Sequence, residues 1–302
     1  MKPPPNILHL HSHDTGRFIQ PYGHAVSTPC LQKFAEQGVL FRQAFCISPT
    51  CSPSRAALLT GQSPHVCGMQ GLANPPWSYQ LAELSHLLPN VLRGEGYDTV
   101  IGGVQHITHK ANVDQQGFLV QLNLDDIGED VPDLHERAAA YIRQAASTDD
   151  ASPWFMSVGF DQTHRDNCQG DPDTGSGFSQ PDPYNVDELD ARYVMPPAIY
   201  PDVPEIRRDM ASYHEGVRRL DQRIGHVIAE LDACGAGENT LIIVTTDHGI
   251  AWPAMKCNLS DHGTGVMLLL RGPGGFSGGR VVDQMVTHLD LFPTILEVTG
   301  LG

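Results

Sequence analysis

The sequence is poor in positive charge. It has 19 lysine and arginine residues against 35 aspartate and glutamate residues, which gives a formal net charge of -16 at pH 7. Contacts with nucleic-acid phosphates and with anionic lipid headgroups need many lysine and arginine side chains. We therefore expect no nucleic acid and no membrane surface among its partners. A small anionic substrate is not excluded, because salt screens distant surface charges over about 10 Å.

Long hydrophobic runs and a targeting segment are also absent. The longest apolar run, Val266 to Leu270, has the length of a strand, whereas a helix that crosses a bilayer needs about 20 apolar residues. The prolines after Met1-Lys2 are not followed by the apolar core and cleavage site of a signal peptide. The seven cysteines are scattered, without a C-x-x-C pair, and indicate no disulfide framework. Together these features predict a cytoplasmic protein.

The hydrophobic pattern predicts strands that alternate with helices. Expected strands are Asn6–Ser12, Val39–Phe45, Tyr97–Ile101, Trp154–Phe160, Thr240–Thr246 and Met267–Leu270. Expected helices cover about 29–37, 53–60, 81–92, 134–146, 205–234 and 288–299. The Pro- and Gly-rich stretch 165–204 is too long for an ordinary connection and is interpreted as an excursion on the substrate side. Continuous apolar strands between helices are typical of an α/β fold with a mostly parallel sheet covered on both faces.

Polar clusters follow three of the predicted strands. His13-Asp14 comes after the first strand, 161–164 after the strand that ends at Phe160, and Asp247-His248 after the strand that ends at Thr246. Ligands of open parallel sheets bind outside the carboxyl ends of the strands. We therefore expect the three clusters to form one site. His9, His11 and His13 also share one face of the first strand, since side chains alternate with a period of two.

The segment from Cys51 to Gly61 carries a specific motif. It reads Cys-Ser-Pro-Ser-Arg-Ala-Ala-Leu-Leu-Thr-Gly and resembles the signature of the sulfatase family, Cys-x-Pro-Ser-Arg followed by a short helix that ends in Leu-Thr-Gly. The resemblance extends over nearly the whole chain, through Pro5–Leu8, the 246–249 turn and the 290–294 segment. Three further segments, 65–72, 163–165 and 195–211, resemble the sulfamidase (heparan N-sulfatase) branch of the family, although less specifically than the cysteine motif resembles the family signature.

This resemblance implies a fold and a domain organisation. The family belongs to the alkaline phosphatase superfamily, so we expect an alkaline-phosphatase-like α/β/α sandwich with a mostly parallel central sheet. Residues 1–302 would form the N-terminal catalytic domain. The small C-terminal subdomain that normally follows in the family is expected to be absent.

The resemblance also implies a set of catalytic residues. Cys51 would be converted to formylglycine by a formylglycine-generating enzyme, and one hydroxyl of the hydrated aldehyde would attack sulfur. Arg55 would hold the alkoxide, Lys256 would bind the sulfate oxygens, and His164 would assist the leaving group. His106 matches a further histidine of the family. A nucleophile at the start of a helix also lies near the positive end of the helix dipole.

A divalent metal ion is implied as cofactor. The family positions are Asp14, Asp247, His248 and the modified Cys51, with His13 in place of an aspartate that the family usually has. Calcium is the usual family metal and prefers oxygen ligands. Two imidazoles among the ligands favour manganese or zinc instead.

One departure leaves alternatives open for the reaction. Val104 stands where the family has a lysine that bridges nucleophile and sulfate, and Gln105, His109 and Lys110 are candidates to replace it. We expect hydrolysis of a sulfate ester or sulfamate in a sulfated small molecule or saccharide. The alternatives are a phosphonate monoester or phosphodiester hydrolase on the same scaffold, and an anion-binding homologue with impaired catalysis.

Overall fold

An eight-stranded sheet forms the centre of the computed structural model, which describes residues 3–108, 110–124, 131, 133–148, 151–165, 178 and 190–302. The strand order is β5-β4-β6-β1-β7-β8-β2-β9. The strands are β1 (Asn6–Ser12), β2 (Val39–Phe41), β4 (Asp98–Gly103), β5 (Val120–Leu124), β6 (Trp154–Gly159), β7 (Thr240–Thr246), β8 (Leu268–Arg271) and β9 (Arg280–Val282). The first five strands of this order, β5, β4, β6, β1 and β7, run parallel to one another. β8 is antiparallel to both β7 and β2. A second, two-stranded sheet pairs β3 (Ala44–Phe45) with β10 (Val286–Thr287).

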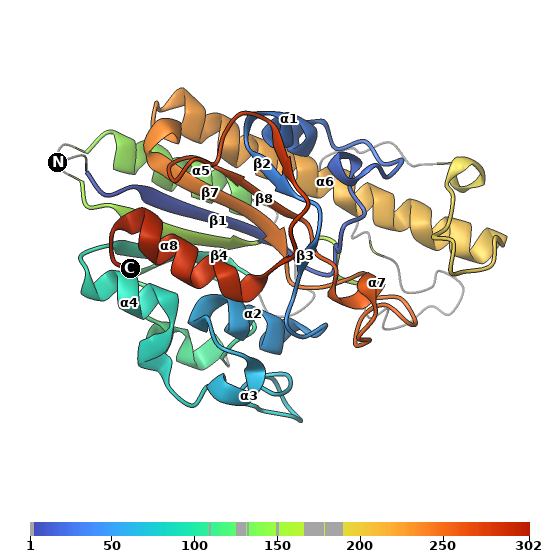
Figure 1. Cartoon of the computed structure of the whole chain (residues 1–302), viewed down its shortest axis with the longest axis horizontal. Coiled ribbons are helices and arrows are strands. Elements are labelled where there is room, and N and C mark those ends of the chain that lie inside the picture. Colours follow the sequence, from blue (N-terminus) through green and yellow to red (C-terminus); the bar gives the residue numbers. More distant parts are fainter. Residues whose placement is uncertain are drawn as a thin grey trace.

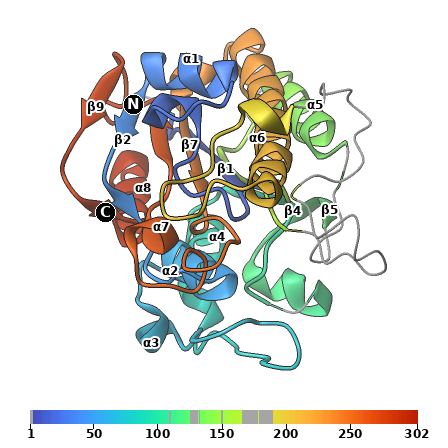
Figure 2. The ribbon, with the colours of Figure 1, turned by 90° about the vertical axis from the view of Figure 1, so that its right-hand side faces the viewer.

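Helices cover both faces of the large sheet (Figures 1 and 2). On one face lie α1 (Pro29–Gln37), α5 (Leu134–Ala146) and α6 (Pro204–Ala233); on the other lie α2 (Cys51–Thr60), α4 (Leu88–Gly94) and α8 (Leu291–Thr299). Two short helices, α3 (Pro64–Cys67) and α7 (Asp261–Thr264), lie outside these layers. The predicted α/β/α sandwich with a mostly parallel sheet is confirmed.

The alternation of side chains along the strands divides the core in two. Leu8 and Leu10 of β1 pack in the apolar cluster on the α6 side, whereas Ile7 packs in the cluster on the α2 side. His9 and His11 therefore also face α2, because they have the parity of Ile7. Their imidazole rings are stacked with centroids 4.6 Å apart.

Several predicted elements differ from the observed ones. The predicted strand Val39–Phe45 is broken by a turn at Arg42-Gln43. The predicted helix 81–92 is a 3-10 turn, Leu84–His86, followed by α4, because Pro89 fits only the first turn of a helix. α2 begins at Cys51 rather than at Pro53. Of the predicted excursion 165–204, residues 166–177 and 179–189 lie outside the described residues.

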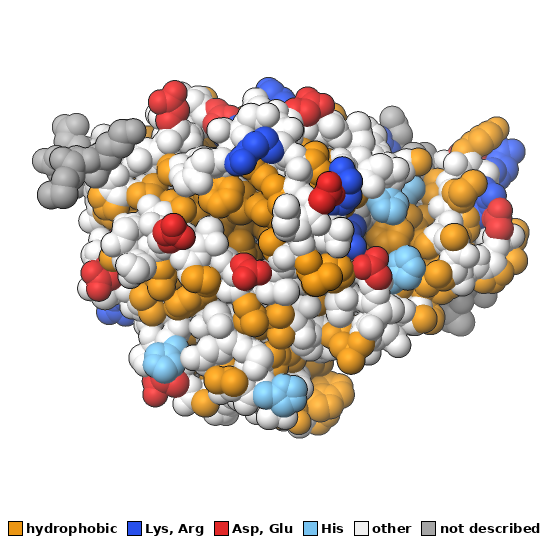
Figure 3. Space-filling view, in the orientation of Figure 1, with side chains coloured by type: hydrophobic (Ala, Val, Ile, Leu, Met, Phe, Trp, Pro, Cys, Tyr) orange, Lys and Arg blue, Asp and Glu red, His pale blue; other side chains and the backbone are white. Residues whose placement is uncertain are grey.

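Three further features concern apolar helices, surface charge and cysteines. Among the described residues, no helix combines the length and the apolar character needed to cross a membrane. On the face drawn in Figure 3, acidic side chains are spread singly rather than gathered in one patch. The six described cysteines, which do not include Cys168, are free.

Candidate active site

The pairing of β1 with β7 brings two carboxylates together. Ser12 is the register partner of Thr246, so the chain segments that follow leave the sheet side by side. Asp14 and Asp247 meet there, and the backbone N–H of Asp14 donates a 2.8 Å hydrogen bond to Asp247 Oδ1. Asp14 has a φ of +58°, a left-handed conformation that aspartate adopts more readily than most residues.

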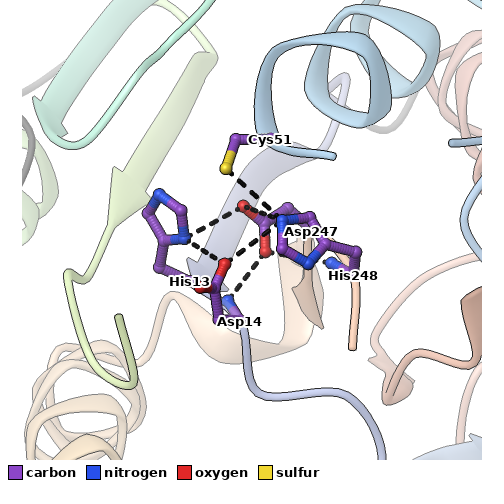
Figure 4. Close-up of side chains that lie close together, drawn as sticks. All are labelled: His13, Asp14, Cys51, Asp247 and His248. Carbon is purple, nitrogen blue, oxygen red and sulfur yellow. Dashed lines mark hydrogen bonds and ion pairs between the residues drawn. The ribbon is translucent and has the colours of Figure 1, made fainter. Parts of the chain in front are cut away.

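Five side chains from three segments point toward a common centre in Figure 4. They are His13, Asp14, Cys51, Asp247 and His248, all buried, and one donor atom from each lies within 4.8 Å of every other. The structure thus brings together all the residues predicted to bind a metal. Two nitrogens, a sulfur and carboxylate oxygens form a donor set that fits a divalent cation.

Two cations neutralise the carboxylates. Lys256 Nζ lies 2.7 Å from Asp14 Oδ2, and Arg55 Nη2 lies 2.9 Å from Asp247 Oδ2. Burial alone would raise the pKa of Asp14, but Lys256, His13 and His248 hold it well below its usual range. Burial likewise opposes ionisation of Asp247, and His248, His13 and Arg55 lower its pKa below the usual range. Both carboxylates are therefore charged at neutral pH.

Cys51 is the first residue of α2, directly after the N-cap Thr50. Its Sγ atom lies 3.4 Å from His248 Nε2, and the side chain is buried. Burial on its own would raise the pKa of the thiol, but Lys256, His13 and His248 hold it well below the usual value. This environment favours the thiolate, which is the reactive and metal-binding form of cysteine.

The two central imidazoles are oriented through their outer nitrogens. His248 Nδ1 lies 2.9 Å from the carbonyl oxygen of Gly249, and His13 Nε2 lies 3.3 Å from His106 Nδ1. Each ring thus has an outer nitrogen with a partner and an inner nitrogen that faces the cluster. Burial opposes protonation of both rings, but Asp247 and Asp14 raise the pKa of His13 to about 10 and that of His248 above its usual value, so the inner nitrogens carry protons that a bound cation would replace. Such partners on the second nitrogen are typical of metal-binding histidines.

His106 and His164 flank His13. The ring centroid of His164 lies 4.4 Å from that of His13, and the ring centroid of His106 lies 5.1 Å from it. Burial is the main cause that lowers the pKa of each flanking histidine to about 4. Both rings are therefore neutral at pH 7.

Arg55 and the position of the missing lysine show a rearranged charge network. Beside its ion pair with Asp247, Arg55 Nη1 lies 2.7 Å from His11 Nδ1. The Val104 side chain is buried, and it lines a cavity behind Asp247 together with His11 and Arg55. The predicted contact of Arg55 with the reacting oxygen remains a prediction.

None of the three proposed substitutes for the lysine is placed at the cluster by the described structure. The Gln105 amide is held within its own loop, by hydrogen bonds to the Thr108 carbonyl at 2.7 Å and from the Ile107 N–H at 2.9 Å. His109 and the side chain of Lys110 lie outside the described residues.

His11 is a site residue whose contact the sequence did not reveal. It touches Arg55 rather than the metal-binding cluster, and its Nε2 lies 3.3 Å from Ser157 Oγ. Gly159 leaves room for the ring, because a Cβ there would lie 2.5 Å from His11 Cε1. The only signal in the sequence was the shared face of His9, His11 and His13.

Comparisons with known proteins show the family of the chain. The model of the sulfatase family matches residues 5–301. The human N-sulphoglucosamine sulphohydrolase is 33% identical over 97% of this chain, and the match spans 60% of the human protein. The chain thus covers less than two thirds of the length of that relative.

Solved structures support the fold. The crystal structure of Ps i-CgsB in complex with k-i-k-neocarrahexaose superimposes with a TM-score of 0.76 and 20% identity, over 99% of this chain and 72% of the other. The phosphonate monoester hydrolase of Agrobacterium radiobacter gives 0.70 and 22%, over 99% and 74%. The alkaline-phosphatase-like architecture expected from the sequence is therefore confirmed. With the family model matched from residue 5 to residue 301, this chain belongs to the sulfatase family.

Proposed function

We propose that the protein hydrolyses a sulfate ester or a sulfamate. The observation that carries this proposal is the position of Cys51. It lies in the family signature at the start of α2, with its Sγ 3.4 Å from His248 Nε2 in the cluster that contains Asp14 and Asp247. The name of the human relative, a sulphohydrolase, supports the same reaction class.

The nucleophile is residue 51 after a formylglycine-generating enzyme has converted it to formylglycine. The hydrated aldehyde of this residue supplies the attacking hydroxyl. The residues around it can perform the remaining tasks. Lys256 is the charged group of the site that is partly open to solvent, with a side-chain exposure of 21%, so it can meet an incoming sulfate oxygen. Within the described part of the chain, His164 Nδ1 is a buried nitrogen without a hydrogen-bond partner, and the leaving group of a bound substrate would supply one.

A divalent cation bound to the cluster would act as a Lewis acid on the sulfuryl oxygens. Calcium is the metal expected from the family, whereas His13 and His248 favour manganese or zinc. Arg55 keeps Asp247 charged and fixed for this task, through contacts of 2.9 Å and 3.2 Å. Electrostatic stabilisation of this kind is usually the largest catalytic contribution.

The substrate is proposed to be a sulfated small molecule or saccharide. Support comes from the human relative, which is named a sulphohydrolase of N-sulphoglucosamine. A cytoplasmic location and maturation by a formylglycine-generating enzyme remain predictions from the sequence.

A second candidate is phosphonate monoester or phosphodiester hydrolysis. The two imidazoles of the donor set favour it, and a phosphonate monoester hydrolase shares the fold with a TM-score of 0.70. Val104 in place of the family lysine supports a third candidate, an anion-binding homologue with impaired catalysis.

Parallel assays on aryl sulfate and aryl phosphonate esters, with calcium, manganese or zinc added, separate the first two candidates. The material must first be examined by mass spectrometry of the Cys51 peptide, so that the converted fraction is known. We expect faster turnover of the sulfate ester per converted molecule. Preference for the phosphonate would establish the second candidate, and saturable sulfate binding without turnover would establish the third.

A further inference from the structure

The donor atoms of the cluster are spaced for a small coordination sphere. In a tetrahedral zinc site, with bonds of about 2.0 Å to nitrogen or oxygen and about 2.3 Å to sulfur, neighbouring donors lie about 3.3 to 3.5 Å apart. Here Cys51 Sγ lies 3.4 Å from His248 Nε2, and His13 Nδ1 lies 3.3 Å from Asp247 Oδ2. A third distance, from His248 Nε2 to Asp247 Oδ2, is 3.7 Å, and the donor atoms of the cluster all lie within 4.8 Å of one another.

The oxygen atoms of the cluster are a poor match for calcium, which takes six to eight oxygen ligands. Asp14 Oδ2 is held by Lys256, and Asp247 Oδ1 accepts hydrogen bonds from the backbone N–H groups of Asp14 and His248. Asp14 Oδ1 lies only 2.6 Å from His13 Nδ1, which is the distance of a hydrogen bond rather than of two ligands on one ion. Nitrogen and sulfur donors therefore have to complete the site.

The outer contacts of both histidines fit zinc ligation as well. Gly249 holds the Nδ1 side of His248, and His106 holds the Nε2 side of His13, so the opposite nitrogens face the centre. A divalent ion leaves the cluster with a single excess positive charge. The thiolate and the two carboxylates carry three negative charges, while Lys256, Arg55 and the ion carry four positive ones.

We propose that the chain with Cys51 still a thiol has a second property: it binds a borderline divalent cation of the zinc type through Cys51 Sγ, His248 Nε2, His13 Nδ1 and Asp247 Oδ2. Binding replaces the Sγ–H bond by a bond from Sγ to the cation. It likewise replaces the N–H bonds of His13 Nδ1 and His248 Nε2, which lie 2.6 Å and 3.1 Å from Asp14 Oδ1, by bonds from these nitrogens to the cation. These protons leave to solvent, while the outer nitrogens keep theirs toward His106 and Gly249. The conversion of Cys51 consumes this thiolate ligand, so the site before conversion selects metals differently from the site after it. This inference concerns the same cluster as the proposed hydrolase, but it does not depend on catalysis.

The test is a titration with Co²⁺ of the full chain produced without conversion, with the Cys51 thiol verified by mass spectrometry. We expect one equivalent of cobalt to give a near-ultraviolet thiolate-to-cobalt charge-transfer band and the visible bands of a four-coordinate ion. One equivalent of Zn²⁺ should remove both, while a large excess of Ca²⁺ should leave them unchanged.

Two variants and one control assign the ligands. Cys51→Ser should abolish the charge-transfer band and weaken cobalt binding at least about tenfold, and His248→Asn should weaken binding by a similar factor. Cys257→Ser is the matched control, because Cys257 is an exposed cysteine beside Lys256, and it should leave the band intact. Circular dichroism shows whether each variant is folded.

Three results would overturn the inference: bound cobalt without the charge-transfer band in the unaltered chain, a band that survives in Cys51→Ser, or displacement of cobalt by calcium at comparable concentrations. The first of these needs no variant, so the proposal stays open to refutation even if a substitution prevents folding. Turnover of aryl sulfate by the converted chain is measured separately, and either proposal can fail while the other stands.

Discussion

The two ends of β1 and β7 differ sharply in chemistry. Along their first residues, Ile7, Leu8, Leu241 and Ile242 are fully buried in apolar clusters. At their carboxyl ends the same strands lead into Asp14 and Asp247, which are equally buried but charged. Burying apolar surface stabilises the fold, whereas burying charge costs free energy even when the charges are paired. One pair of strands thus supplies stability at one end and chemistry at the other.

The largest effect should come from the charged end. Replacing Cys51 by alanine removes the proposed nucleophile, so turnover of an aryl sulfate should fall at least about a thousandfold with little change in melting temperature. Cys46→Ala is the matched control, since Cys46 is also buried but lies outside the cluster. Retention of a tenth of the activity in Cys51→Ala would contradict the assignment of Cys51.

The apolar end should show the opposite pattern. Leu10 of β1 is fully buried on the α6 side, so Leu10→Ala should lower the free energy of unfolding by about 2–5 kcal/mol. Turnover per folded molecule should change little. Denaturant titration and kinetics on one preparation check both, and Leu259→Ala, at a residue with 88% exposure, serves as the control. A large loss of turnover with unchanged stability would break the comparison.

His214 tests whether buried titratable groups outside the carboxyl ends matter for stability. Burial, followed by His24 and Arg218, lowers the pKa of His214 on α6 from 6.5 to about 4. Between these values the unfolded chain binds more protons than the folded one. The contribution of His214 is therefore complete above pH 6.5 and is lost as the pH falls toward 4, by about 3 kcal/mol.

His214→Gln should accordingly make the unfolding free energy less dependent on pH between 6.5 and 4. Denaturant titrations at several pH values measure this slope. The exposed residue His65 provides the control His65→Gln, and an equal change of slope in both variants would argue against the role of burial.

The smallest effect is expected at the surface. Arg143 of α5 forms an ion pair of 2.8 Å with Glu230 of α6, and the arginine side chain is 60% exposed. Solvent and salt screen such a pair, so Arg143→Ala should leave both melting temperature and turnover within experimental error. A clear drop in melting temperature would show that this surface contact contributes more than exposed pairs usually do.

Much of the fold could be predicted from the sequence because hydrophobic periodicity is local. β1, β7 and α5 have the predicted bounds. The strands β5, β9 and β10 were missed, since short, partly exposed strands carry little pattern. The break of the 39–45 segment at Arg42-Gln43 depends on two different sheets and is a tertiary effect.

In the site, too, some features could be predicted from the sequence and others depend on tertiary contacts. The motif and the strand ends were sufficient to predict that Asp14, Cys51 and Asp247 converge. The contact of Arg55 with His11 could not be predicted, because it joins a helix and a strand that are 44 positions apart in the sequence. The inward turn of the Gln105 amide depends on Gln116, whose own placement follows from the loop as a whole.

The 30-residue helix α6 should resist local unfolding. At 1.5 Å per residue the helix is about 45 Å long, and it packs against both α1 and α5. Asp221, from its middle, also accepts the backbone N–H groups of Cys30 and Leu31 at the first turn of α1. Because two neighbouring helices contact α6, its middle turns should not unfold locally. We therefore expect the amide protons there to exchange with deuterium only when the entire domain unfolds.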